Sequence, residues 1–199
     1  MPEPQAPPQT RDLMHSEEIK HLVRAAYGSI DTSTAAVARR LYSPDELVQV
    51  PPSAADRALG LANHLRFAGI EPGETILDVG CGWGIDTILA AKRTGADGRV
   101  VGLDFLPEML ARTLRAAAEA GLDNVEVLEG EMEAIPLADG SVDHVISNGV
   151  INLSPRKARA LAECARVLRP GGKLTVSDLT LAEEELPPEI LTHPAAWAG

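Results

Sequence analysis

The sequence is poor in cysteine, in positive charge and in long apolar runs, and each shortage excludes a class of protein. Two cysteines, Cys81 and Cys164, cannot build a disulfide framework or a structural zinc site. Only 18 basic residues oppose 29 acidic ones, and the net charge of −11 argues against nucleic acids and anionic membranes as partners. No run reaches the roughly 18 apolar residues of a membrane span, and the proline-rich start lacks the apolar core of a signal peptide. We therefore expect a soluble, reduced, cytoplasmic protein without a bound metal.

The first third of the chain reads as a tail followed by helices. Residues 1–15 contain the proline-rich start and are expected to form a disordered tail. Residues 16–70 are expected to form an N-terminal helical cap, beginning with a helix over 16–28. A second long helix is expected from Ser53 to Gly69, because Ser53 can cap its first turn and Gly69 can end its last.

Beyond residue 70 the pattern changes to short aliphatic, β-branched runs, most of them separated by helical text. Strands alternating with helices predict an α/β fold with a doubly wound, mainly parallel sheet. We expect this domain to cover 71–182, and residues 183–199 to form a linker and a short helix. The expected strands are 74–80, 99–105, 125–130, 142–148 and 173–179, with a turn at 169–172 before the last.

The most informative stretch is the glycine-rich turn after the first expected strand, which contains Gly80, Gly82 and Gly84. Glycines there let the backbone approach a ligand closely, and the following helix offers free amides and a positive dipole end. A dinucleotide-binding turn would have its third glycine at Ile85. The second strand ends in Asp104, roughly 20 residues further on, where a carboxylate reaches a ribose diol. These features favour a nucleoside without a pyrophosphate, and S-adenosylmethionine is the candidate cofactor.

Several segments resemble, in order and spacing, the class I S-adenosylmethionine-dependent methyltransferases. They are DVGCGWG, GLDFLPEML, GEMEAIPL and the long stretch from SVDHVISNGVINLSPRK to RVLRPGGKLTVSDL, and the last resembles most the arsenite methyltransferase branch. The resemblance covers 70–182 and implies a Rossmann-like fold that transfers a methyl group to a small molecule. A complete fold of this class has two more strands after the fifth. No strand pattern follows residue 179, so we expect the sheet to lack its last two strands.

The resemblance also implies which residues bind the cofactor. The backbones of Gly80, Cys81 and Gly82 would line its methionine portion, and Asp104 would hold the ribose hydroxyls. Asn148, at the end of the fourth strand, would face the reacting sulfonium. Phe105, Glu131 and Met132 would surround the adenine, although plain core packing remains an alternative for the first and last of these. The complete expected set is Asp78, Gly80, Cys81, Gly82, Asp104, Phe105, Glu131, Met132 and Asn148.

Methyl transfer from a sulfonium requires little from the protein beyond alignment of the reactants and exclusion of water. If the acceptor must lose a proton, the candidate bases are Asp178, His144 and His193. Asp178 is preferred because it ends the fifth strand, at the edge where ligands of open α/β sheets bind. His144 lies inside a strand and is expected to be structural. Tyr27 matches a tyrosine that lies over the cofactor in the family's amino-terminal YG motif.

The chain departs from the arsenite methyltransferases at their cysteines. Gly149 and Leu61 stand where that branch carries cysteine, and Cys164 is expected to be a small buried residue. Trivalent arsenic is held by thiolates, and no pair of thiols is placed for it, so we expect arsenite to be a poor acceptor.

Two alternatives remain open: a cofactor-binding remnant that acts as an interaction module, and an NAD-dependent dehydrogenase.

The fifth expected strand, KLTVSDL, would form an edge of the sheet with little charge. An uncovered edge strand can pair with the same strand of another copy. We therefore expect either a homodimer through this edge or a marginally stable monomer.

Overall fold

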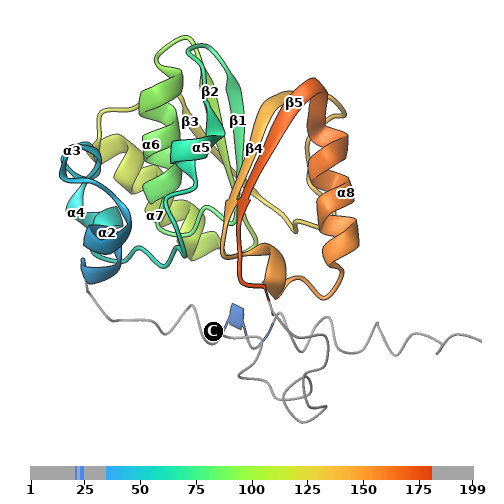
Figure 1. Ribbon diagram of the computed structural model, residues 1–199, viewed down its shortest axis with the longest axis horizontal. Coiled ribbons are helices and arrows are strands. Elements are labelled where there is room, and N and C mark those ends of the chain that lie inside the picture. Colours follow the sequence, from blue (N-terminus) through green and yellow to red (C-terminus); the bar gives the residue numbers. More distant parts are fainter. Residues whose placement is uncertain (1–20, 22, 25–34, 181–199) are drawn as a thin grey trace, which may run out of the picture. The chain divides into compact units, whose positions relative to one another are not determined.

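The computed structural model describes residues 21, 23–24 and 35–180, and residues 35–180 belong to one compact unit. Its strands form one parallel sheet in the order β3-β2-β1-β4-β5 (Figure 1). This order confirms the predicted doubly wound sheet, because the chain moves outward from β1 in both directions. The strands are β1 (Thr75–Val79), β2 (Arg99–Asp104), β3 (Val125–Glu129), β4 (Val142–Asn148) and β5 (Leu168–Ser177).

Helices cover both faces of the sheet (Figure 1). One face carries α6 (Ile85–Thr94) and α7 (Pro107–Glu119), and the other carries α8 (Lys157–Val167). Four short helices pack on the same side as α6 and α7, and a short 3-10 helix, η1 (Ile151–Leu153), follows β4. The short helices are α2 (Ala36–Leu41), α3 (Pro44–Leu47), α4 (Pro52–Ala55) and α5 (Leu65–Ala68).

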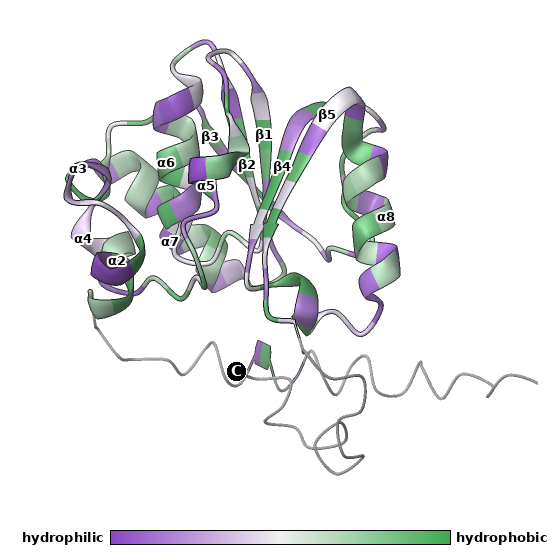
Figure 2. Ribbon diagram, in the orientation of Figure 1, coloured by the Kyte–Doolittle hydropathy of each residue, from purple (hydrophilic) through white to green (hydrophobic). Residues whose placement is uncertain are grey.

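The alternation of side chains along β1 divides the core into two parts. Ile76 points toward α6 and packs in one cluster, whereas Leu77 and Val79 point toward α8 and pack in the other. All three side chains are buried. Figure 2 shows α8 in alternating green and purple bands, as expected for a helix with one apolar face. Asp78 points to the same side as Ile76, toward α6, and this places its carboxyl group beneath the glycine turn.

The helix expected from Ser53 to Gly69 is wrong as a single element. The chain forms α4 and α5 and is not helical over 56–64. Ser53 lies inside α4 and its hydroxyl donates to Glu119 at 2.6 Å, so it does not cap the helix. Gly69 does end α5, with φ of 59° in the left-handed region.

The last strand begins earlier than expected. β5 starts at Leu168, directly after α8, and therefore includes the Arg169–Gly172 stretch that was predicted to be a turn. A register shift between Val142 and His144 accommodates this stretch as an irregularity in the ladder. A glycine with φ of 82° at Gly171 supplies the backbone conformation that the irregularity requires.

Some expectations fall outside the described residues. They are the tail over 1–15, most of the helix over 16–28, the linker over 183–199, and the candidate residues Tyr27 and His193. His21, Val23 and Arg24 are described and are helical. Among the described helices, none is both long and apolar enough to cross a membrane.

Candidate functional site

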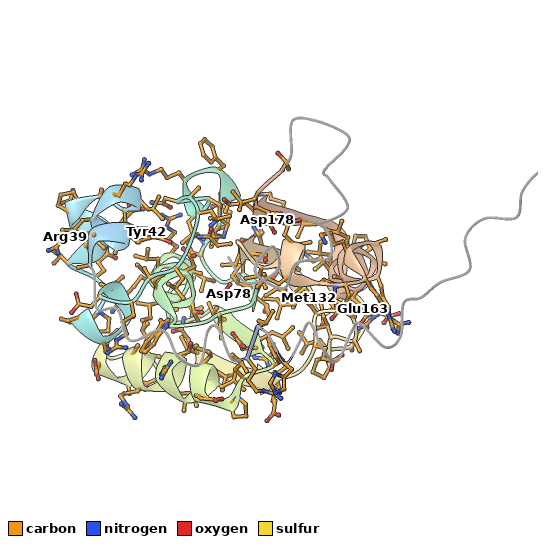
Figure 3. All side chains as sticks on the ribbon, turned by 90° about the horizontal axis from the view of Figure 1, so that it is seen from below. Arg39, Tyr42, Asp78, Met132, Glu163 and Asp178 are labelled. Carbon is orange, nitrogen blue, oxygen red and sulfur yellow. The ribbon has the colours of Figure 1, made fainter. Side chains whose placement is uncertain are left out.

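The predicted site residues lie at one edge of the sheet. Because all strands are parallel, their carboxyl ends meet there. The glycine turn follows β1, Asp104 ends β2, Glu131 comes shortly after β3, Asn148 ends β4, and Asp178 follows β5. Figure 3 looks at the molecule from below, the side on which the strands end, and labels Asp78 and Asp178.

The glycine turn can be formed only by glycine at its key positions. Gly80, Gly82 and Gly84 have φ values of 77°, 52° and 86°, which side chains rarely adopt. A Cβ on Gly80 would lie 2.5 Å from a methyl carbon of Val150, and a Cβ on Gly84 would lie 3.1 Å from the Cα of Thr113. The turn therefore lies directly against the segment after β4 on one side and against α7 on the other.

Hydrogen bonds join the turn to the end of β2. The amides of Gly80 and Cys81 donate to the carbonyl of Leu103 at 2.8 and 3.0 Å. The amide of Gly82 donates to the Asp104 carboxylate at 3.1 Å. The hydroxyl of Thr113 donates to the Gly82 carbonyl at 3.0 Å. These amides form hydrogen bonds inside the protein. A ligand would therefore contact the backbone surface that the glycines leave uncovered.

Asp104 is held in place by backbone amides. Its Oδ2 accepts from Gly82, and its Oδ1 accepts from Leu106 at 3.0 Å. Burial raises the pKa of Asp104 above its ordinary value, although these amides oppose the shift. Each carboxylate oxygen can accept a second hydrogen bond. The group can therefore receive two neighbouring hydroxyls, as a ribose diol presents them.

Asp78 is a buried carboxyl beneath the turn. Thr87, on the first turn of α6, donates to it at 2.5 Å. Burial, followed by the nearby negative charge of Asp86, raises the pKa of Asp78 to about 8. A group with these surroundings favours either a proton or a neighbouring cation.

The side chain of Asn148 is directed into the protein. Its Oδ1 accepts from the amides of Leu61 and Ala62 at 2.9 and 3.4 Å. Its Nδ2 donates to the Ala62 carbonyl at 2.8 Å and to Asp86 at 2.9 Å. All the hydrogen-bonding positions of the amide are therefore filled. The prediction that Asn148 faces a sulfonium stays untested. In the structure its side chain binds the backbone of residues 61–62 and Asp86.

The residues expected around an adenine follow β2 and β3. The amide of Gly130 donates to the Asp104 carbonyl at 3.1 Å, which brings the segment after β3 close to the end of β2. Glu131 is exposed, and Phe105 and Met132 are half-buried. Met132 also packs against the core cluster beneath α8, as the core-packing alternative holds.

The candidate bases have different surroundings. Asp178 accepts from the amides of Asn152 and Leu179 at 2.9 and 2.8 Å, at the carboxyl edge. His144 is fully buried in β4, with Nε2 2.8 Å from the Thr175 hydroxyl. Burial lowers the pKa of His144 below its ordinary value. The buried position of His144 favours a structural role over the role of a base.

Both thiols are buried, although Cys81 belongs to the glycine turn at the carboxyl edge. Cys81 is buried, and burial raises its pKa well above the ordinary value. Cys164 lies on the buried face of α8, and burial raises its pKa to about 11. A Cβ on Gly149 would lie 3.1 Å from Cγ of Leu61, so the two positions at which the resemblance implies cysteine adjoin each other. No group of three or more potential metal ligands occurs in the part of the chain that the structure describes.

Several residues at this edge have no signal in the sequence. Tyr42 donates from its hydroxyl to Asp86 at 2.7 Å, and the partners are 44 positions apart. Trp83, inside the glycine turn, has its ring 4.9 Å from the Arg57 guanidinium carbon and 3.9 Å from that of Arg112. Only the three-dimensional fold brings these groups together.

Comparisons with known proteins agree on one family. A family model for the methyltransferase domain matches residues 70–198. An arsenite methyltransferase of Halobacterium salinarum is 41% identical over 170 residues, which are 85% of this chain and 43% of that protein. The crystal structure of an arsenic(III) S-adenosylmethionine methyltransferase from Chlamydomonas reinhardtii matches with 33% identity and a TM-score of 0.60, over 88% of this chain and 54% of that one. A SAM-dependent methyltransferase from Aquifex aeolicus matches with 29% identity and a TM-score of 0.56, over 78% and 79%.

The chain spans about half the length of the curated relatives that it matches.

Proposed function

Because the chain belongs to the methyltransferase domain family, we propose that it transfers a methyl group from S-adenosylmethionine to a small-molecule acceptor. The observation that carries the proposal is the glycine turn with the Asp104 carboxylate hydrogen-bonded across it. The turn supplies an open backbone surface, and Asp104 supplies a carboxylate that can accept the two hydroxyls of a diol. Both lie at the carboxyl ends of adjacent strands.

The residues present fit this cofactor. Asp104 would hold the ribose, and the turn from Gly80 to Gly82 would lie along the methionine chain, where a Cβ on Gly82 would meet, beyond its chain neighbours, only the Gly80 carbonyl oxygen at 3.9 Å. Asp78, a buried carboxyl with a raised pKa, would be stabilised as a carboxylate by the ammonium of the cofactor. Phe105 and Met132, half-buried after β2 and β3, would supply apolar contacts for the adenine.

When bound, the cofactor supplies an electrophilic methyl group. The protein then has to bring a nucleophile into line with it and exclude water. Asp178 is the residue that we propose as a base for acceptors that must lose a proton, because it lies at the carboxyl edge and not within the sheet.

We propose an acceptor other than arsenite. The names of two relatives concern arsenite and arsenic(III), and soft ions of this kind require thiolates. The only cysteines in this chain are Cys81 and Cys164. Both are buried, and they pack against different elements, Cys81 against Thr113 on α7 and Cys164 in the cluster beneath α8. The wall formed by Leu61 and Gly149 is apolar and suits an uncharged organic acceptor.

Self-association through β5 is a further part of the proposal. Leu174 and Val176 on this strand are 40% and 38% exposed. Among the described strands, β5 is paired on one side only, by β4. A second copy would satisfy the other side of the strand.

Isothermal calorimetry tests the proposed function directly. We expect binding of S-adenosylmethionine and of S-adenosylhomocysteine, and a methylation screen over thiol, metalloid and quinol acceptors then identifies the acceptor class. Cofactor binding with no methylation of any acceptor would favour the remnant acting as an interaction module. Tight binding of NADH without binding of S-adenosylmethionine would overturn the proposal in favour of a dehydrogenase.

A further inference from the structure

Residues 60–62 cross the carboxyl end of β4 with few side-chain contacts of their own. Gly60 and Ala62 are small, and Leu61 is 39% exposed. The helices on either side, α4 and α5, have four residues each. Local propensity and apolar burial therefore contribute little to the order of this segment.

One side chain holds the segment in place. Asn148 accepts from the amides of Leu61 and Ala62 through Oδ1 and donates to the Ala62 carbonyl through Nδ2. A Cβ on Gly60 would lie 2.4 Å from that nitrogen, so the close approach requires glycine. Asn148 thus binds the backbone as a neighbouring strand would.

Asp86, together with the backbone of residues 61–62, fixes the orientation of the Asn148 amide. The second hydrogen of Nδ2 points to Oδ2 of Asp86 at 2.9 Å. A carboxylate can only accept hydrogen bonds, so it selects the NH₂ end of the amide and turns the oxygen toward the amides of Leu61 and Ala62. Tyr42 donates to Oδ1 of Asp86 at 2.7 Å, and both of these side chains are buried. Each donor in this network therefore faces an acceptor. The Tyr42 hydroxyl, just after α2, donates to Asp86 on α6, and Asn148 on β4 donates to the same carboxylate.

We infer that Asp86 is a positioning residue for the acceptor side of the site. By orienting Asn148, it holds residues 60–62 over the end of β4 and places the Leu61 side chain against Gly149. Leu61 then forms an apolar wall that keeps water from the acceptor. This inference rests on the proposed function, since that function is what makes this edge an acceptor site.

Hydrogen–deuterium exchange at the amides of Leu61 and Ala62 tests the inference, because these are the bonds that Asn148 accepts. In Asp86→Asn, a carboxylate that only accepts hydrogen bonds is replaced by an amide that both donates and accepts. Residue 86 then no longer selects the NH₂ end of the Asn148 amide. We expect exchange at both positions to accelerate at least about tenfold, the effect of losing roughly one hydrogen bond. The affinity for S-adenosylhomocysteine, measured by calorimetry, should stay within about twofold. Tyr42→Phe removes only the outer bond and should have a smaller effect in the same direction.

A double variant provides the rescue. Asp86→Asn with Asn148→Asp lets an amide again donate to a carboxylate and an oxygen again face the amides of Leu61 and Ala62, but it also places a carboxylate oxygen against the Ala62 carbonyl, to which Asn148 donates in the wild type. We therefore expect partial recovery, with exchange at these positions slower than in Asp86→Asn but faster than in the wild type. If Asn148 contacted the cofactor instead, the double variant would lose affinity for S-adenosylhomocysteine without restoring slow exchange, and that result would overturn the inference.

Leu61→Ala is the matched control, since it shortens the side chain and leaves every bond to Asn148 in place. Exchange at residues 61 and 62 should not change in this variant. Wild-type exchange rates in Asp86→Asn would overturn the positioning role. Should that variant fail to fold, Tyr42→Phe and the double variant carry the same test. A wild-type protein that binds neither S-adenosylmethionine nor S-adenosylhomocysteine would instead refute the proposed function, whatever the exchange rates are.

Discussion

The carboxylates at the carboxyl edge have the same chemistry but different surroundings. Asp104 accepts backbone amides on both oxygens, Asp86 accepts a phenol and an amide, and Asp78 accepts a single hydroxyl in a buried setting near Asp86. The number and kind of donors decide what each group can do next. Asp104 keeps room for ligand hydroxyls, Asp86 orients a neighbour, and Asp78 holds a proton or faces a cation.

Replacing Asp104 should weaken cofactor binding. In Asp104→Ala we expect the affinity for S-adenosylhomocysteine to fall by about 1.5–3 kcal/mol, the usual value for hydrogen bonds to a charged group. Calorimetry measures the loss. Glu108→Ala is the matched control, because it removes a nearby negative charge from the surface of α7 and should leave the affinity almost unchanged. Equal losses in both variants would show that charge alone, and not contact with the ligand, is responsible.

Asp78 should make the stability of the unliganded protein depend on pH. Its pKa is raised from 3.8 to about 8 by folding, so the folded state keeps a proton that the unfolded state releases between these values. The stabilisation is complete at low pH and is lost as the pH rises toward 8. Asp78→Asn cannot ionise. Relative to wild type, it should gain more than about 1 kcal/mol of unfolding free energy between pH 6 and pH 8.

Urea unfolding at both pH values measures this gain. His64 and His144, whose pKa values are lowered by burial, contribute equally to both proteins and cancel in the difference. A difference between variant and wild type that stays constant with pH would contradict the prediction.

At the scale of segments, the chain shows where local patterns succeed and where they fail. The central strands β1 and β4 could be predicted because each is a short, mostly apolar run that is buried along nearly its whole length. The helix over 53–69 could not, since its interruption depends on hydrogen bonds between residues 61–62 and Asn148, more than 80 positions away. Tyr42 and Asp86 were missed for the same reason, whereas Asp104 and the glycine turn were found because their role depends on adjacent residues.

The contact between Leu61 and Gly149 predicts a gain of function. In Leu61→Cys with Gly149→Cys, the two thiols would stand next to each other, because a Cβ at 149 lies 3.1 Å from Cγ of Leu61. We expect measurable As(III) affinity under reducing conditions. The cost is about 1–2 kcal/mol of stability, since residue 149 has φ of 75°.

Calorimetry with arsenite measures the affinity of this variant. The serine pair, Leu61→Ser with Gly149→Ser, matches the size of the cysteines without the thiolates and should not bind. Strong As(III) binding by the wild-type protein would show that Cys81 or Cys164 serves as a ligand after all.

For the whole molecule, the parallel order of the sheet is the property that the sequence predicted most securely. Alternating strand and helix patterns allow few topologies when crossovers are right-handed, and the observed order β3-β2-β1-β4-β5 is one of them. The family match and the structural likeness to arsenic(III) methyltransferase confirm the resemblance read from the motifs. The positions of the short helices α2 to α5 on the sheet were less predictable, because their packing depends on contacts with residues far away in the sequence.

The edge of the sheet should control the association state of the 199-residue chain. We expect a concentration-dependent dimer in sedimentation experiments. Leu174→Lys with Val176→Lys should weaken it, because charges on an edge strand oppose pairing. Leu161→Lys, at an equally exposed apolar position on α8, is the control and should have no effect. A monomer at high concentration that melts cooperatively well above about 65 °C would show that the edge is protected.

The position of Trp83 provides an optical report on the glycine turn. The chain has two tryptophans, and the indole of Trp83 lies between two guanidinium groups with its nitrogen buried and without a hydrogen-bond partner among the described residues. An excited indole responds to nearby charge, so its emission depends on the positions of Arg57 and Arg112. Any ligand that shifts the turn by a fraction of an ångström alters that electric field. Steady-state emission, read with Trp197 replaced, can thus follow occupancy of the site in real time without a label.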